Sequence, residues 1–201
     1  MERIKISATS AAAAPTGIAN ATACTGVGPW VPNVASGAGD GLAHLITITQ
    51  AGATNHSAKT AIITGTDAAG NPQTETALAL PNGAATVTST KYFLTVTSVA
   101  ISATIGADTM TMGWAAGSVS DWKQMQSQSK SLAGFNLGIG CTVTGTPNYT
   151  VQYTFDGVGI FDHATITGKT ANFSGQQAHP VGAIRLKFTV AGGVNLTALQ
   201  Y

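Results

Sequence analysis

The sequence predicts an all-β protein with two tandem antiparallel β-sandwich (or barrel-like) domains and an extended N-terminal arm. Many short segments rich in Thr and aliphatic residues alternate with period two, which is typical of half-buried strands. Gly, Asn, Asp and Pro separate these segments at short intervals, and no long helix is predicted. We place the arm at residues 1–36, the first domain at residues 37–117 and the second domain at residues 118–201.

The arm is predicted from its irregular composition. Residues 3–7 alternate weakly, which suits one short strand, and residues 10–15 offer at most one helical turn before a proline. Residues 26–32 contain two prolines and two glycines, so we expect them to be extended and irregular. Trp30 is the only large aromatic residue in the arm, and it either inserts into a neighbouring subunit or packs on its own domain. Such an arm could add a strand to a neighbour's sheet edge.

The first domain is organised around a predicted hairpin over residues 60–80. Two strand-like runs flank residues 67–72, in which Gly70 and Asn71 tolerate a positive φ and Pro72 interrupts strand pairing. The other strands expected in this domain are residues 45–49, 85–89, 92–102 and 109–114. A series of short strands joined by short turns favours a sandwich or barrel.

The second domain shows the same style of patterning without a residue-level repeat of the first. The strands expected in it are residues 135–143, 149–155, 160–167, 184–190 and 194–201. Within 184–188, the three apolar residues point to one face, and Arg185 and Lys187 point to the other.

The composition is poor in charge. Only 8% of the 201 residues are charged and the net charge is +1, whereas 44% are hydrophobic. An ordinary globular domain has roughly 25% charged residues. The chain therefore has no field to steer nucleic acid or an anionic membrane. Either neighbouring proteins cover much of its surface, or it is a soluble sandwich with a neutral surface rich in Thr and Ser.

The N-terminal residues, the apolar segments and the cysteines indicate the compartment in which the protein folds. The charged N-terminus is not followed by an apolar segment, so it does not predict a secretion signal, and no apolar run is long enough to span a bilayer. Cys24 and Cys141 are far apart in sequence. One disulfide is arithmetically possible, but two free and partly buried thiols fit folding in a reducing cytoplasm better.

No catalytic or metal-binding pattern is recognisable. The four histidines lack the spacing of a zinc pair, and we expect them to be turn or surface residues: His44, His56, His163 and His179. Most of the eight carboxylates stand next to Gly or Ala in predicted turns, and Gly-x-Ser-x-Gly is absent. We therefore predict that the protein is not an enzyme and uses no metal or cofactor.

Two sets of residues are candidates for binding. The possible interface residues are four cations, for which a solvated face is the alternative, and the aromatic residue of the arm: Arg3, Lys5, Arg185, Lys187 and Trp30. Exposed aromatic residues on a sandwich can instead stack on sugars. The candidates for such a glycan platform are Trp114, Trp122 and Tyr153.

Several segments resemble small virion structural proteins of tailed bacteriophages, of the decoration, head–tail or fibre type. In the second domain these segments are residues 149–157 (Tyr-Thr-Val-Gln-Tyr-Thr-Phe-Asp-Gly), 179–186 (His-Pro-Val-Gly-Ala-Ile-Arg-Leu) and 191–200. In the first domain they are residues 62–76 and 90–99. The motifs are turns and strand ends, and the resemblance covers most of residues 43–201.

The resemblance implies a β-sandwich component of a virion, made in the bacterial cytoplasm and present in many copies. The implied partners are further copies of the chain and other capsid or tail proteins. The alternative function is a receptor- or glycan-binding module of a phage particle. The resemblance carries no catalytic residues over to this sequence.

Overall fold

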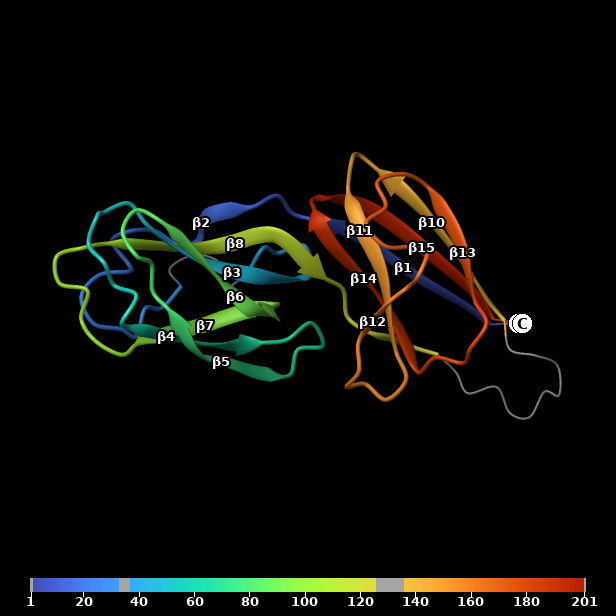
Figure 1. Cartoon of the computed structure of the whole chain (residues 1–201), viewed down its shortest axis with the longest axis horizontal. Coiled ribbons are helices and arrows are strands. Elements are labelled where there is room, and N and C mark those ends of the chain that lie inside the picture. Colours follow the sequence, from blue (N-terminus) through green and yellow to red (C-terminus); the bar gives the residue numbers. More distant parts are fainter. Residues whose placement is uncertain (1, 33–36, 126–135, 201) are drawn as a thin grey trace. The chain divides into compact units, whose positions relative to one another are not determined.

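A computed structural model describes residues 2–32, 37–125 and 136–200. All regular elements in these ranges are β-strands, so the protein is all-β (Figure 1). The chain divides into two compact units. The inserted unit comprises residues 12–118, and the split unit comprises residues 1–11 together with residues 119–201.

Two sheets form the inserted unit. One has the strand order β2–β8–β3–β6, with bounds Ala14–Ala19, Met110–Val119, Ala43–Gln50 and Thr86–Phe93. The other has the order β5–β4–β7, with bounds Pro72–Ala79, Thr60–Thr66 and Thr95–Ile101. The predicted hairpin over residues 60–80 is β4 and β5, which pair antiparallel from Thr60↔Ala79 to Thr66↔Pro72. Gly70 in its turn has a φ of 85°.

The core of the inserted unit collects the inward side chains of both sheets. Ile46 and Ile48 of β3 and Ile63 of β4 are almost completely buried, because alternate residues of a half-buried strand face inward. The other large, fully buried side chains of this core are Ile18, Trp30, Leu80, Phe93, Met110 and Met112.

The split unit also has two groups of strands. Its four-stranded sheet has the order β1–β15–β10–β13, with bounds Glu2–Ser10, Gly192–Gln200, Leu137–Thr144 and Phe173–Gln177. In the second group, β11 lies between β12 and β14, and β9 also pairs with β14. The bounds of β9, β11, β12 and β14 are Lys123–Gln124, Asn148–Thr154, Phe161–Asp162 and Ala183–Val190. Tyr149, Val151, Leu186 and Phe188 contribute to the buried interior.

The described residues of the expected arm belong to these two units, which corrects the boundaries 1–36, 37–117 and 118–201. β1 pairs with β15 along its whole length, from Glu2↔Gln200 to Ser10↔Gly192. Ile6 and Ala8 face inward, whereas Arg3 and Lys5 are exposed. The weak alternation over residues 3–7 thus reflects a real strand, but its partner is the last strand of the same chain.

Residues 10–32 also differ from the prediction. No helical turn forms over residues 10–15, because β1 ends at Ser10 and β2 begins at Ala14. Trp30 is only 2% exposed and packs in the core of the inserted unit. Its backbone exchanges two hydrogen bonds with Val99 of β7, at 2.8 and 2.9 Å. Of the two alternatives for Trp30, packing on its own domain is therefore correct.

One residue of β5 has an unfavourable backbone conformation. Ala77 is exposed and has a φ of 65°, a region that is strained for residues with a Cβ atom. It lies beside a register irregularity, since β5 and β4 pair as Ala61↔Leu78 and then Ile63↔Glu75.

We predict that Ala77→Gly stabilises the protein by about 0.5–1 kcal/mol, because relief of the left-handed strain exceeds the added entropy of the unfolded chain. Ala79→Gly is the matched control, since Ala79 is also exposed on β5 but has no positive φ. That control should destabilise by roughly 0.5–1 kcal/mol. Urea unfolding of both variants checks the prediction, and equal losses of stability would contradict it.

Candidate functional site

The split unit displays a cluster of apolar side chains between β11 and β12. We call this cluster the apolar tip; its members are Tyr153, Phe155, Val158, Ile160 and Phe161. Val158 is 83% exposed, Phe155 52%, Ile160 49% and Phe161 46%. Large apolar side chains scattered singly on a surface are ordinary, but a contiguous group indicates an interaction site.

The three aromatic rings of the tip support one another. The Tyr153 and Phe161 rings stack at 5.6 Å between centroids with an interplanar angle of 22°. Phe155 meets Tyr153 edge-on at 5.5 Å and Phe161 at 5.6 Å. Such pairs add about 0.5–1.5 kcal/mol each beyond burial, so the rings form a defined surface and not three independent side chains.

A hydrogen-bonded turn holds the rest of the tip. Asp156 Oδ1 accepts from the backbone N–H groups of Val158 at 2.9 Å and Gly159 at 2.8 Å. The Gly157 N–H donates to Thr154 Oγ1 at 2.9 Å. The backbone donors of Val158 and Gly159 are the main reason that the pKa of Asp156 lies below its ordinary value. The turn therefore presents Val158 in a preformed conformation.

A second arrangement, which we call the polar ladder, crosses the sheet formed by β12, β11 and β14. Gln152 Nε2 donates to Asp162 Oδ1 at 2.7 Å, and Arg185 Nε donates to Gln152 Oε1 at 2.9 Å. The Arg185 guanidinium lies 4.4 Å above the Trp122 ring centroid. A cation over an indole face is attracted by the electron density of the ring. Arg185 and Trp122, which were predicted for different roles, therefore contact each other.

The three residues of the predicted glycan platform do not share a described surface. Trp122 has one face covered by Arg185. Tyr153 belongs to the apolar tip, and it follows Gln152 of the ladder on the same strand, so the two side chains point to opposite faces. Trp114 lies in the inserted unit, where its ring packs over Gly17 and its Nε1 donates to Ala12 O at 2.9 Å.

The expected interface residues also have different surroundings. Trp30 is buried within its own unit, and Arg185 is part of the polar ladder. Arg3 and Lys5 are exposed on β1, opposite Leu199 and Thr197 of β15. Lys187 is half-buried on β14, opposite Thr150.

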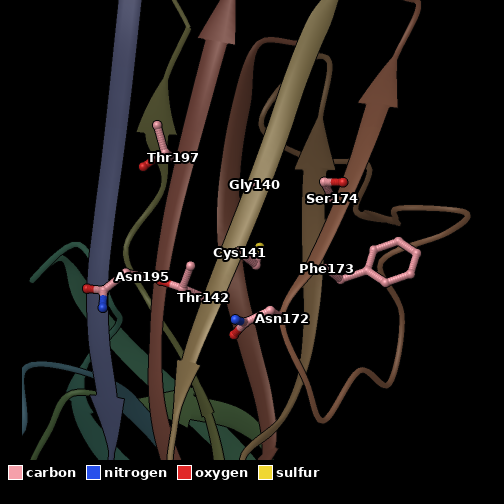
Figure 2. A pocket seen from close by; sticks show the side chains of 8 residues that line it. All are labelled: Gly140, Cys141, Thr142, Asn172, Phe173, Ser174, Asn195 and Thr197. Carbon is pink, nitrogen blue, oxygen red and sulfur yellow. The ribbon is translucent and has the colours of Figure 1, made fainter.

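The outer face of the four-stranded sheet is hollowed along β10 (Figure 2). One depression, of about 430 Å³, lies around Gly140, Thr142 and Asn172. A second, of about 640 Å³, lies around Gly138 and Gln176. Their linings share Gly140, Ser174 and Thr197, so together they form one groove, which we call the β10 groove.

Three of the four histidines are buried. The expectation of a turn or surface position is wrong for His44, which lies within β3, whereas His56 and His163 each begin a turn. His44 Nε2 lies 2.9 Å from Asp40 Oδ2. His56 Nε2 lies 2.7 Å from Asp108 Oδ2, and Lys59 Nζ donates to His56 Nδ1 at 2.8 Å. Hydrogen bonds from Thr54 and then His56 lower the pKa of Asp108. These contacts are internal, and they give the buried rings of His44 and His56 polar partners.

His163 is the third buried histidine. Its Nδ1 accepts from the backbone N–H groups of Thr165 and Ile166, both at 3.3 Å. Burial is the main reason that the pKa of His163 is lowered, and a contact with the Gln176 backbone acts in the opposite direction. Burial therefore favours the neutral form of this imidazole in the folded protein.

The two cysteines are free and buried, as predicted. Burial raises the pKa of each thiol to about 11. Within the described ranges, no group of three His, Cys, Asp or Glu side chains is placed to hold a metal ion, and no helix is long and apolar enough to cross a membrane.

The sequence predicts some of these site residues better than others. Alternation placed Tyr153 and Arg185 on their strands, but the loop of the apolar tip, between the expected strands 149–155 and 160–167, received no predicted role. The sequence of that loop, Phe-Asp-Gly-Val-Gly-Ile-Phe, is rich in large apolar residues for a turn, and this was the available signal. The β10 groove depends on which strands lie beside Gly138 and Gly140, which local patterning does not reveal.

Comparison of the chain with models of protein families, with curated proteins and with solved structures found no match. The resemblance to bacteriophage virion proteins therefore remains a prediction from sequence motifs.

We predict that His163 makes stability sensitive to acid. Because its folded pKa lies below the ordinary value of 6.5, the unfolded chain takes up the proton first as the pH falls below about 6.5. His163→Asn, which keeps an acceptor near the position of Nδ1, should lose less stability than the wild type between pH 7 and pH 5. Denaturant unfolding at each pH checks this, with His179→Asn as the exposed control. Parallel pH profiles for wild type and His163→Asn would contradict it.

Proposed function

We propose that this chain is a non-enzymatic structural protein of a bacteriophage particle. In this role many copies join further copies of the chain and other capsid or tail proteins, and so decorate, stabilise or connect them. The observation that carries the proposal is the apolar tip, where four large apolar side chains are 46–83% exposed on a preformed turn. Preformed apolar and aromatic anchors are typical of the residues that dominate binding energy in protein interfaces.

The size of the tip indicates how it would act. With about 150–250 Å² for a whole aromatic side chain, its exposed apolar surface is on the order of 400 Å². Two tips facing each other would bury about 800 Å², less than the roughly 1,200–2,000 Å² of a stable interface. The tip therefore suits an anchor inserted into a partner protein as part of a larger contact. Many copies on one particle would strengthen such contacts through avidity.

The composition supports the same role. A net charge of +1 and 8% charged residues provide no electrostatic attraction to nucleic acid, but they permit extensive burial against other proteins. The proposal treats each unit as a β-sandwich domain. In place of a free arm that exchanges between subunits, residues 2–10 complete the split unit. The two domains then offer two separate surfaces for joining particle proteins.

We predict that the chain co-purifies with intact virions in many copies and that Val158→Asp lowers its copy number about tenfold or more. The reason is that the substitution places an unpaired carboxylate in an apolar contact. Val190→Asp is the matched control, because Val190 is 47% exposed in the same unit but lies outside the tip. Quantitative mass spectrometry of purified particles measures the copy number, and circular dichroism checks that both variants fold.

Three results would contradict the proposal: a chain found only in the soluble fraction of the lysate, an unaltered copy number for Val158→Asp, or an equal loss for both variants. Light scattering of the full chain then measures self-association separately. Truncation of residues 1–36 is unsuitable for this purpose, since it would remove β1 and β2 from their sheets.

A further inference from the structure

The floor of the β10 groove carries no side chain at its first two outward positions, and Thr142 forms its far end. Successive residues of a strand face opposite sides of its sheet. Leu137, Ile139 and Cys141 of β10 are buried, so the alternating positions 138 and 140 face outward. Both outward positions are glycine, and a Cβ atom added at Gly140 would meet no atom within 4 Å. From Gly138 to Thr142 the floor runs four residue steps, or about 14 Å at the usual strand rise. The groove is therefore long enough for a short linear ligand.

The walls of the groove come from the neighbouring strands. On one side stand Asn195, Thr197 and Leu199 of β15, which pair with Thr142, Gly140 and Gly138. On the other side stand Ser174 and Gln176 of β13, which pair with Gly140 and Gly138. Figure 2 shows the hydroxyl and amide groups of Thr142, Asn172, Asn195 and Thr197 on both sides of β10.

The lining combines amide and hydroxyl groups with apolar surface, and it carries no charged side chain. Asn172 Oδ1 accepts from the Val143 N–H at 2.8 Å, and Asn195 Oδ1 accepts from Ser7 Oγ at 2.6 Å. These bonds orient both amides and leave the NH₂ groups as donors. The hydroxyls of Ser174 and Thr197 can both donate and accept. The groove thus offers hydrogen bonds of both kinds without a counter-ion.

We propose that the β10 groove binds a neutral oligosaccharide. Sugar hydroxyls both donate and accept hydrogen bonds, which matches the amide and hydroxyl lining. An anionic ligand would be expected to use Arg or Lys. Arg3 and Lys5 lie on β1, across β15 from β10, and Lys169 lies 4.2 Å over the ring of Phe173, but none of these three side chains lines the groove. A protein partner would be expected to use apolar anchors, and Leu199, at 37% exposure, is the one large exposed apolar residue of this lining.

The open shape of the groove implies weak binding at each site. A dissociation constant of about 1 mM corresponds to about 4 kcal/mol, which a few hydrogen bonds on an open surface can supply. Binding through many copies would raise the overall affinity. This inference rests on the lining residues of the groove and does not depend on the proposed role in a particle. The isolated chain should bind the sugar as well.

The test is a nuclear magnetic resonance titration of the full ¹⁵N-labelled chain with neutral hexasaccharides of glucose, of mannose and of N-acetylglucosamine. We expect at least one of them to shift the backbone amide signals of residues 138–142, 173–177 and 195–199. Gly140→Leu should weaken this binding about tenfold or more, because the new side chain occupies the floor and its Cβ atom would meet no atom within 4 Å. Thr144→Leu is the matched control, since Thr144 is exposed on the same face of β10 but outside the groove.

Two further controls test the charge argument. Raising the salt concentration and replacing Lys5 by Ala should both leave the affinity unchanged, because no cation lines the groove. The proposal is overturned if none of the three hexasaccharides binds, if the shifts lie outside the groove, or if Gly140→Leu binds like the wild type. It is also overturned if the groove signals broaden with protein concentration alone and Gly140→Leu relieves the broadening, since a second copy would then occupy the face. The Val158→Asp variant should bind the sugar normally, so failure of the particle role and failure of the sugar site remain distinguishable.

Discussion

The pairing of the first strand with the last is the interaction on which the split unit depends. β1 and β15 are hydrogen-bonded from Glu2↔Gln200 to Ser10↔Gly192, and β15 in turn pairs with β10. Without β1, the inward side of β15 would lose the contacts of Ile6 and Ala8, and the backbone of β15 would become an exposed edge. The same sheet carries the β10 groove, so the position of Asn195 and Thr197 follows indirectly from this long-range pairing.

Local pattern was sufficient to predict strands but not their partners. The hairpin of β4 and β5 was predictable, since its turn residues and its two strands are adjacent in sequence. The partner of β1 was not, because period-two alternation shows that a strand has one buried face and says nothing about which strand lies beside it. The proline-rich segment around Trp30 looked irregular, and it is irregular, but a single backbone pairing with Val99 brings its side chain into the core.

The same limit applies to the candidate sites: local pattern predicts the face on which a side chain lies but not the residues that it contacts. Arg185 and Lys187 were correctly assigned to the polar face of a strand, yet their contacts depend on neighbours from distant parts of the chain, such as Trp122 above Arg185 and Thr150 opposite Lys187. The burial of three histidines was not predicted, because spacing along the chain reports local metal-binding motifs only. His56 meets Asp108 across 52 residues of sequence, and only the fold brings the two together. In the apolar tip, by contrast, the interacting residues lie within nine positions, so its unusual apolar content was visible in the sequence.

The insertion of residues 12–118 between β1 and the rest of the split unit has a consequence for synthesis on the ribosome. The inserted unit contains all of its strands by the time residue 119 is made, so it can fold while the remainder is still being translated. β1 emerges before the inserted unit but has no partner until β15 has left the exit tunnel. During that interval β1 is an unpaired strand with apolar residues on one side, a state that favours aggregation or recruitment of chaperones. Arg3 and Lys5, which are exposed in the folded sheet, are charges of the kind that oppose aggregation of an apolar strand.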